Sequence, residues 1–155
     1  MIDEKQVDAL LVSGDIFDTT TPSNRSAELY YQFLTRLIKS CCRHVVITAG
    51  NHDSPSFLNA PKEILKELKV HLVTGVPGET VEDELILLKD EEGTVEMIVA
   101  AVPYLRESAI RTPALAESVE DKVRNLIAGL TQHYHQVAQL AISKREECGR
   151  DIPVV

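Results

Sequence analysis

Two short polar motifs follow predicted strands and carry the side chains best suited to chemistry. In the first, the apolar run Ala9–Val12 ends in Ser-Gly and is followed directly by Asp15. In the second, the β-branched run Val45–Thr48 ends in Ala-Gly and is followed by Asn-His-Asp at residues 51–53. Ligands of open α/β sheets bind at the carboxyl ends of the strands, so we expect these polar side chains to share one edge of a sheet.

The side chains of the two motifs are hard-metal ligands and an acid–base group. Asp15 offers a carboxylate that can bridge two cations, and Asn51 adds a neutral carbonyl oxygen as a further ligand. In two-metal phosphoester hydrolysis, ions roughly 3.5 to 4 Å apart bind the phosphate and activate a water. His52 is then suited to stabilise charge on the phosphate or to protonate the leaving oxygen. Asp53 is a candidate to orient His52 or to cap the following turn.

Each motif also fits a purely structural explanation, a capped loop between a strand and a helix. For one motif alone the two explanations are about equally good, whereas two such motifs in succession favour a site. Asp18 fits a helix entry, or a position behind the metal ligands, better than a ligand position. The other histidines are predicted to be structural or exposed. His44 and His71 adjoin strands, and His133 and His135 are two apart on a helix surface, where they point to nearly opposite sides.

The composition is that of one globular domain. The 155 residues are 44% hydrophobic and 26% charged, without a window of the roughly 20 apolar residues that a membrane span requires. The charged N-terminus lacks a signal-peptide core, so we expect a cytoplasmic protein that makes no membrane contact. The formal charge of −8 argues against a broadly basic nucleic-acid surface, so a DNA contact has to be local or assisted by metal ions and a partner. The spacing of Cys41, Cys42 and Cys148 matches neither a disulfide framework nor a zinc site.

The elements that must position the motifs alternate between strands and helices. Between the motifs, Ser23 or Asn24 can cap a helix. On that helix Leu29 and Phe33 lie away from the main apolar stripe, which fits either burial on both sides or a subunit contact.

After the second motif the pattern predicts a short helix, a strand and a hairpin. Asn59 can cap the helix, with Pro61 in its first turn. Its inner face is predicted to comprise Ile64, Leu65 and Leu68. The strand is predicted at Val70–Val73, and the apolar segments Val81–Leu88 and Thr94–Val99 flank an acidic turn as in a hairpin.

A long helix is predicted near the end of the chain. Ser118, with Asp121 three residues later, fits its start, and Gly149 fits its stop. The predicted apolar stripe comprises Val119, Val123, Leu126, Ile127, Leu130, Tyr134, Val137 and Ala141. Residues Ile152–Val155 fit the entry to another buried strand.

The two motifs together resemble a known family. Gly14–Asp18 followed by Gly50–Asp53 resembles the second and third motifs of the calcineurin-like metallophosphoesterases. The residues around both motifs, and the Val-Pro-Tyr-Leu-Arg segment at 102–106, resemble the SbcD-type exonucleases of that family over nearly the whole chain. The resemblance implies an α/β fold, a layered sheet sandwich flanked by helices and incomplete at both ends. Residues 1–155 would then be a partial nuclease domain.

The resemblance also implies a reaction and partners. Asp15 would bridge two manganese ions, Asn51 would bind one of them, and His52 would be the catalytic histidine and not a ligand. The family's reaction is hydrolysis of DNA phosphodiesters, with an SbcC-type ATPase as partner. Its homodimer is formed by helices that follow these motifs, which would give Leu29 and Phe33 a role.

Parts of the family pattern have no counterpart in this sequence. An Asp-x-His motif is absent before Asp15, and Gly-His and Gly-His-x-His motifs are absent after it. Because Asp15 and Asn51 alone cannot hold two roughly octahedral cations, we expect an internal fragment with weak metal binding and little or no nuclease activity. Two other functions stay open: a phosphoesterase for small phosphoesters or nucleotides, which the negative charge favours, and a non-catalytic folding or dimerisation module.

Overall fold

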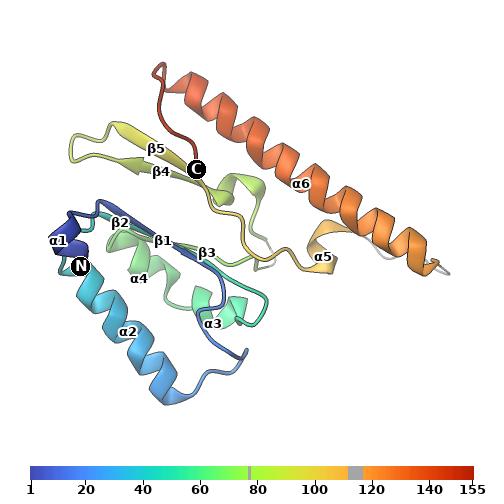
Figure 1. Ribbon diagram of the computed structural model, residues 1–155, viewed down its shortest axis with the longest axis horizontal. Helices are drawn as coiled ribbons and strands as arrows, with labels where there is room; N and C mark the ends of the chain where they lie inside the picture. The colour runs from blue at the N-terminus through green and yellow to red at the C-terminus, as the bar shows by residue number, and fades with distance from the viewer. Residues whose placement is uncertain (77, 112–116) are drawn as a thin grey trace. The chain divides into compact units, whose positions relative to one another are not determined.

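The computed structural model describes residues 1–76, 78–111 and 117–155, which form two compact units. The first unit is Met1–Pro77 and the second is Gly78–Val155. Each unit has its own sheet and its own helices (Figure 1). The expected α/β class is confirmed. No helix among the described residues is both long and apolar enough to cross a membrane.

The first unit is a three-stranded parallel sheet with connecting helices. Its elements are α1 (Ile2–Lys5), β1 (Ala9–Ser13), α2 (Asn24–Ile38), β2 (His44–Thr48), α3 (Pro55–Asn59), α4 (Lys62–Glu67) and β3 (Val70–Val73). The strand order is β1-β2-β3, so β2 is central. In the parallel register Ser13 lies beside Thr48, and Thr48 lies beside Val73. The first two strands therefore end level with each other, and the loops after them leave the same edge of the sheet.

Helix and strand side chains of the first unit share one apolar core. Strand β2 is buried along Val45, Val46 and Ile47, as expected for the central strand of a parallel sheet. The helices contribute Tyr30, Leu34 and Leu37 from α2, Leu58 from α3 and Leu65 from α4. Helix α2 begins where Ser23 accepts a hydrogen bond from the Ser26 backbone, one of the two caps that the sequence allowed.

The second unit is an antiparallel hairpin packed against one long helix. Its elements are η1 (Val81–Glu84), β4 (Leu85–Lys89), β5 (Val95–Ala100), α5 (Glu107–Ile110) and α6 (Val119–Glu147). Ile98 of β5 packs with Ala141 of α6 and with Ile152. Val154 forms an isolated parallel bridge to Ile98, so one bridge replaces the strand predicted at residues 152–155.

A buried ion pair joins α6 to the start of the hairpin. The imidazole Nε2 of His133 lies 3.0 and 2.8 Å from the two carboxylate oxygens of Glu84. The Glu84 side chain is 8% exposed and that of His133 is 16% exposed. The prediction that His133 is an ordinary helix-surface residue is therefore wrong, whereas His135 is exposed as predicted.

Two details of the helix predictions are also wrong. Asn59 caps no helix. Ser54 caps α3 by accepting from the Phe57 backbone, and α4 begins after Pro61 without a side-chain cap. Only one residue of the predicted inner face is buried, Leu65, because Ile64 is 69% and Leu68 is 42% exposed. Leu29 and Phe33 are exposed, in agreement with their place away from the stripe.

The predicted stripe of α6 is buried only at its C-terminal half. The buried residues are Val137 and Ala141. The exposed residues are Val119, Val123, Ile127 and Tyr134. Helical periodicity therefore identified the helix but overestimated how much of it is covered. Ser118 caps α6 by accepting a hydrogen bond from the Asp121 backbone, as predicted.

Candidate functional site

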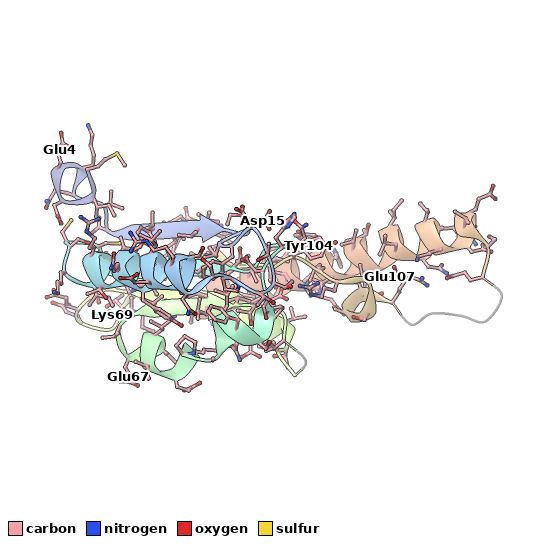
Figure 2. The ribbon with its side chains drawn as sticks, turned by 90° about the horizontal axis from the view of Figure 1, so that it is seen from below. Glu4, Asp15, Glu67, Lys69, Tyr104 and Glu107 are labelled. Carbon is pink, nitrogen blue, oxygen red and sulfur yellow. The ribbon has the colours of Figure 1, made fainter. Side chains whose placement is uncertain are left out.

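The first loop of the site turns sharply at its glycine and its aspartate. Gly14 and Asp15 both have left-handed backbone conformations, with φ values of 71° and 46°. A non-glycine residue with positive φ is uncommon, and aspartate is among the residues that tolerate it. The Gly14 N–H donates to the Thr48 carbonyl at 3.1 Å, which continues the pairing of β1 with β2 into the loop. Figure 2 shows Asp15 just beyond the end of β1.

The second loop approaches Asp15 closely because Gly50 has no side chain. A Cβ atom on Gly50 would lie 2.2 Å from both the backbone nitrogen and the Oδ1 of Asp15. Contacts below 3.0 Å are essentially never seen for real Cβ atoms, so no other residue fits here without movement. The contact lies against backbone, which cannot swing away as a flexible side chain can. Gly50 thus allows the two loops to touch at the metal-ligand candidate.

A buried carboxylate connects the two loops. Asp53 is 0% exposed. Its Oδ1 accepts from the Phe17 backbone at 2.9 Å, and its Oδ2 accepts from Ile16 at 3.1 Å and from Gly50 at 2.8 Å. One side chain therefore satisfies backbone donors of both loops. The expectation that Asp53 caps the following turn is wrong, because Ser54 is the N-cap of α3.

His52 contacts the first loop through both its backbone and its ring. Its backbone N–H donates to Asp15 Oδ1 at 3.2 Å, and its ring Nδ1 lies 3.1 Å from the Asp18 carbonyl oxygen. If Nδ1 carries the proton in this bond, Nε2 is the nitrogen that faces outward for proton transfer. The ring is exposed and so accessible to a substrate. The Asp18 carbonyl, and not the Asp53 carboxylate, makes the ring hydrogen bond that had been expected from Asp53.

Three of the predicted site residues therefore come together at one edge of the sheet. Asp15 and His52 are joined by a hydrogen bond, and Asn51 lies between Gly50 and His52 in the second loop with an exposed side chain. His44 does not belong to this group, because it begins β2 at the opposite end of the strand, and its ring lies beside that of His71 with centroids 6.2 Å apart.

The donor atoms of the site suit a hard divalent cation but form only part of its coordination shell. Asp15 supplies a carboxylate and Asn51 supplies an amide oxygen, both ligand types that magnesium, calcium and manganese accept. Within residues 1–76, 78–111 and 117–155, no group of three or more His, Cys, Asp or Glu side chains is arranged to hold a metal ion. The residues fit one corner of such a site.

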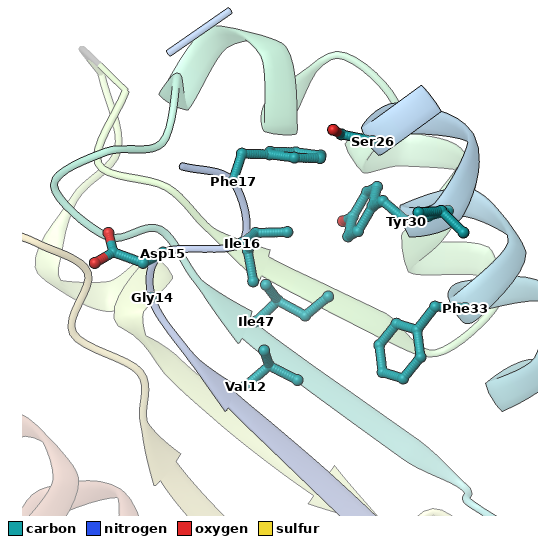
Figure 3. A pocket seen from close by; sticks show the side chains of 10 residues that line it. Val12, Gly14, Asp15, Ile16, Phe17, Ser26, Tyr30, Phe33 and Ile47 are labelled. Atoms are coloured by element: carbon teal, nitrogen blue, oxygen red, sulfur yellow. The ribbon is translucent and has the colours of Figure 1, made fainter. Parts of the chain in front are cut away.

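An apolar pocket lies behind the first loop. It has a volume of about 410 Å³ and opens between β1, the Asp15 loop and α2 (Figure 3). Asp15 and Ser26 are the polar side chains at its wall, and Phe17, Leu29 and Phe33 are among its apolar ones. This pocket gives the site an apolar rear wall, in which Asp15 is the charged group among the described lining residues.

Sequence reasoning missed two features of the site. It treated Gly50 only as the end of a strand, and it gave the Asp18 backbone no part. The clue to the first was available, since both motifs place glycine directly before a ligand candidate and two strands that end level bring these glycines close. A Cβ on Gly14 would in turn lie 3.2 Å from the Gly50 Cα. The Asp18 carbonyl has no counterpart in side-chain patterns.

Comparison with known proteins places this site in a family. A family model described as calcineurin-like phosphoesterase matches residues 1–104. The SbcD component of the nuclease SbcCD from Rhodobacter capsulatus is 38% identical over 122 residues, which cover 76% of this chain and 30% of that protein. The corresponding SbcD protein of Escherichia coli K12 is 34% identical over 131 residues, which cover 84% of this chain and 31% of that protein.

An archaeal protein also matches part of the chain. The DNA double-strand break repair protein Mre11 of Sulfurisphaera tokodaii is 36% identical over 66 residues, or 41% of this chain and 17% of that protein. The chain spans about a third of the length of the bacterial relatives. The family resemblance carried by the two motifs is confirmed. The chain belongs to the calcineurin-like phosphoesterase family.

Proposed function

We propose that this chain is part of a two-metal DNA nuclease that hydrolyses phosphodiester bonds. The observation that carries the proposal is the hydrogen bond from the His52 backbone to Asp15 Oδ1, at 3.2 Å. It joins a carboxylate ligand candidate to the residue that follows Asn51, so a metal ligand set and an acid–base group meet on one surface. A structural loop cap would need no such meeting of polar side chains.

In this proposal each residue has its own role. Asp15 and Asn51 would hold divalent ions through oxygen atoms, and Asp15 would bridge two of them. Bound ions of this kind neutralise the charge on phosphate oxygens by Lewis-acid action. The His52 bond to the Asp18 carbonyl, at 3.1 Å, keeps the ring in one orientation, so that its other nitrogen can donate a proton to the leaving oxygen.

The finer parts of the proposal come from the family and from the named relatives. Manganese is the proposed metal, DNA the substrate, and an SbcC-type ATPase the partner. The relatives that are named as components of SbcCD nucleases support the last two. We also propose a homodimer through α2 and a cytoplasmic location. The charge of −8 fits DNA binding that depends on metal ions and a partner.

A second candidate function is hydrolysis of small phosphoesters or nucleotides. The observation in its favour is the same charge of −8, which weakens the attraction of a long polyanion more than that of a small one. A third, a folding or dimerisation module without catalysis, is supported by the exposed Leu29 and Phe33 on α2.

The deciding experiment is a cleavage assay on the full-length natural protein that contains this segment, with Mn²⁺ and with its ATPase partner. Linear duplex DNA and a nucleotide phosphodiester are supplied as alternative substrates. We expect DNA cleavage, and we expect His52→Ala to slow it by about 100-fold or more, the usual effect of losing a general acid. His135→Ala, which changes an exposed histidine of α6, is the matched control and keeps full activity.

Three results would contradict the proposal. Cleavage of the nucleotide without cleavage of DNA would favour the second candidate. Cleavage of neither, with normal folding and metal loading, would favour a non-catalytic module. Strong manganese-dependent DNA degradation by the 155-residue chain alone, abolished by His52→Ala, would show that the expectation of a weakly active fragment is wrong.

A further inference from the structure

We infer that Asp53 is a positioning residue that fixes the two site loops in their metal-binding arrangement before any metal is present. The inference rests on the proposed function in one respect, the identity of Asp15 and Asn51 as metal ligands. Asp53 itself is completely buried and cannot be a ligand at an exposed site.

The hydrogen bonds of Asp53 run to both loops that carry the ligand candidates. Ile16 and Phe17, which donate to it, directly follow Asp15, and Gly50, which also donates, directly precedes Asn51. The carboxylate therefore holds each loop within two residues of its ligand candidate. Displacement of either loop would leave a buried donor or the buried carboxylate without its partner, which is costly.

The chemistry of these bonds requires a carboxylate. Both oxygens accept, and one of them accepts twice, from Ile16 and from Gly50. An asparagine of the same shape has one acceptor oxygen and one NH₂ donor. Whichever way its amide is turned, the NH₂ group faces at least one backbone N–H, so the two loops can no longer both be held.

The neighbouring residues do not supply the same connection. Ser54 performs the capping of α3, so Asp53 is not needed for that purpose. Gly50 allows the loops to approach but adds no attraction through a side chain. The His52 bond to Asp15 Oδ1 is at the exposed surface, where it competes with water and, in the proposed function, with a metal ion. The buried bonds of Asp53 lie beyond the reach of both.

The test is Asp53→Asn in the 155-residue chain, followed by Mn²⁺ titration in ¹H–¹⁵N spectra. Paramagnetic broadening of the Asp15 and His52 amides reports site-specific binding even when affinity is low. Groups that position metal ligands usually change metal affinity by about 10- to 100-fold. We expect the Mn²⁺ concentration for half-maximal broadening to rise by at least about tenfold. We also expect the Gly50 amide resonance to move upfield and its exchange with solvent to accelerate.

The matched control is Glu84→Gln, which replaces another buried carboxylate by an amide in the second unit. It is expected to leave the broadening curve unchanged. If Asp53→Asn folds and gives the wild-type curve, with unchanged Gly50 exchange, the inference is overturned.

A measurement on the wild-type chain keeps the inference testable if Asp53→Asn does not fold. In metal-free buffer the amides of Ile16, Phe17 and Gly50 should be protected from hydrogen exchange, and rapid exchange of all three would overturn the inference. If the wild-type chain shows protected amides but no broadening near Asp15 at any Mn²⁺ concentration, the metal assignment of the proposed function fails while the positioning of the loops by Asp53 stands.

Discussion

Gly50 contributes to the site by the absence of a side chain. Its missing Cβ would lie 2.2 Å from the backbone nitrogen and Oδ1 of Asp15. We expect Gly50→Ala to force the loops apart and to lower the free energy of unfolding by roughly 1 to 3 kcal/mol, the usual cost of overpacking. Urea unfolding followed by circular dichroism measures this loss, and Mn²⁺ broadening of the Asp15 amide measures its effect on the site.

Gly93→Ala is the control for Gly50→Ala. A Cβ on Gly93 meets no atom within 4 Å, but the residue has a φ of 88°, so alanine there is strained by its backbone conformation alone. That strain is worth about 1 to 2 kcal/mol. A comparable loss of stability without any change in Mn²⁺ broadening is expected. Equal effects of both variants on the metal titration would contradict the role given to Gly50.

At the scale of residues, the sequence could predict proximity but not contacts. The meeting of Asp15 with Asn51 and His52 follows from parallel strands that end at one edge. The partners of Asp53 could not be foreseen, because they depend on the left-handed turn at Gly14 and Asp15, which no side-chain pattern specifies. Backbone donors and acceptors are present at nearly every residue, so their use leaves no trace in the sequence.

Helix α6 is attached to the hairpin by a titratable contact. Burial raises the pKa of Glu84 above the value of 4.5 that it has in an unfolded chain; the hydrogen bond from His133 opposes this, and Glu79 and Asp83 add to it. Between the two pKa values the folded chain binds more protons than the unfolded one. The contribution of Glu84 to stability therefore decreases as pH rises from about 4.5 through the pKa of the folded state.

Glu84→Gln removes that titration. The free energy of unfolding of the variant, relative to wild type, should rise as pH increases across this window, as measured by urea unfolding at intervals from about pH 4.5 to about pH 7.5. Glu91→Gln, an exposed residue of the hairpin turn, is the control and should show a constant difference. A difference for Glu84→Gln that falls with rising pH would show that the pairing with His133 outweighs the burial.

At the scale of elements, strands were predicted better than helix surfaces. The strand Val70–Val73 has the predicted bounds, because a run of apolar residues buried on both sides is explicit in the sequence. The predicted helix before it failed at its cap, since Asn59 and Ser54 both precede a proline-containing turn and only packing decides between them. The exposed half of α6 has the same cause: periodicity reports which residues are apolar and not which of them find a partner.

The exposed apolar pair on α2 bears on the assembly of the whole molecule. Leu29 is 50% and Phe33 is 42% exposed. In the proposed homodimer these side chains are covered, so the double variant Leu29→Glu, Phe33→Glu should shift a dimer to the 17.2 kDa monomer in gel filtration with light scattering. Ile64→Glu changes a residue that is 69% exposed on α4 and should leave the dimer intact. A wild-type chain that is monomeric at all concentrations would contradict the interface.

The two compact units do not coincide with the family match. The match covers residues 1–104, so it includes the whole first unit and continues through the β4–β5 hairpin of the second. The sequence contains no linker-like composition at residues 76–78 that would predict the division. The expectation of a single partial nuclease domain over residues 1–155 stays a prediction.

The level ends of β1 and β2 set a condition for moving this site to another protein. Ser13 and Thr48 lie side by side, and the loops that follow them depend on each other through a glycine contact and a buried carboxylate. A designer who copied Asp15, Asn51 and His52 alone would copy functional groups without their geometry. The smallest portable unit is the pair of loops together with Asp53, set on two neighbouring parallel strands of matched length.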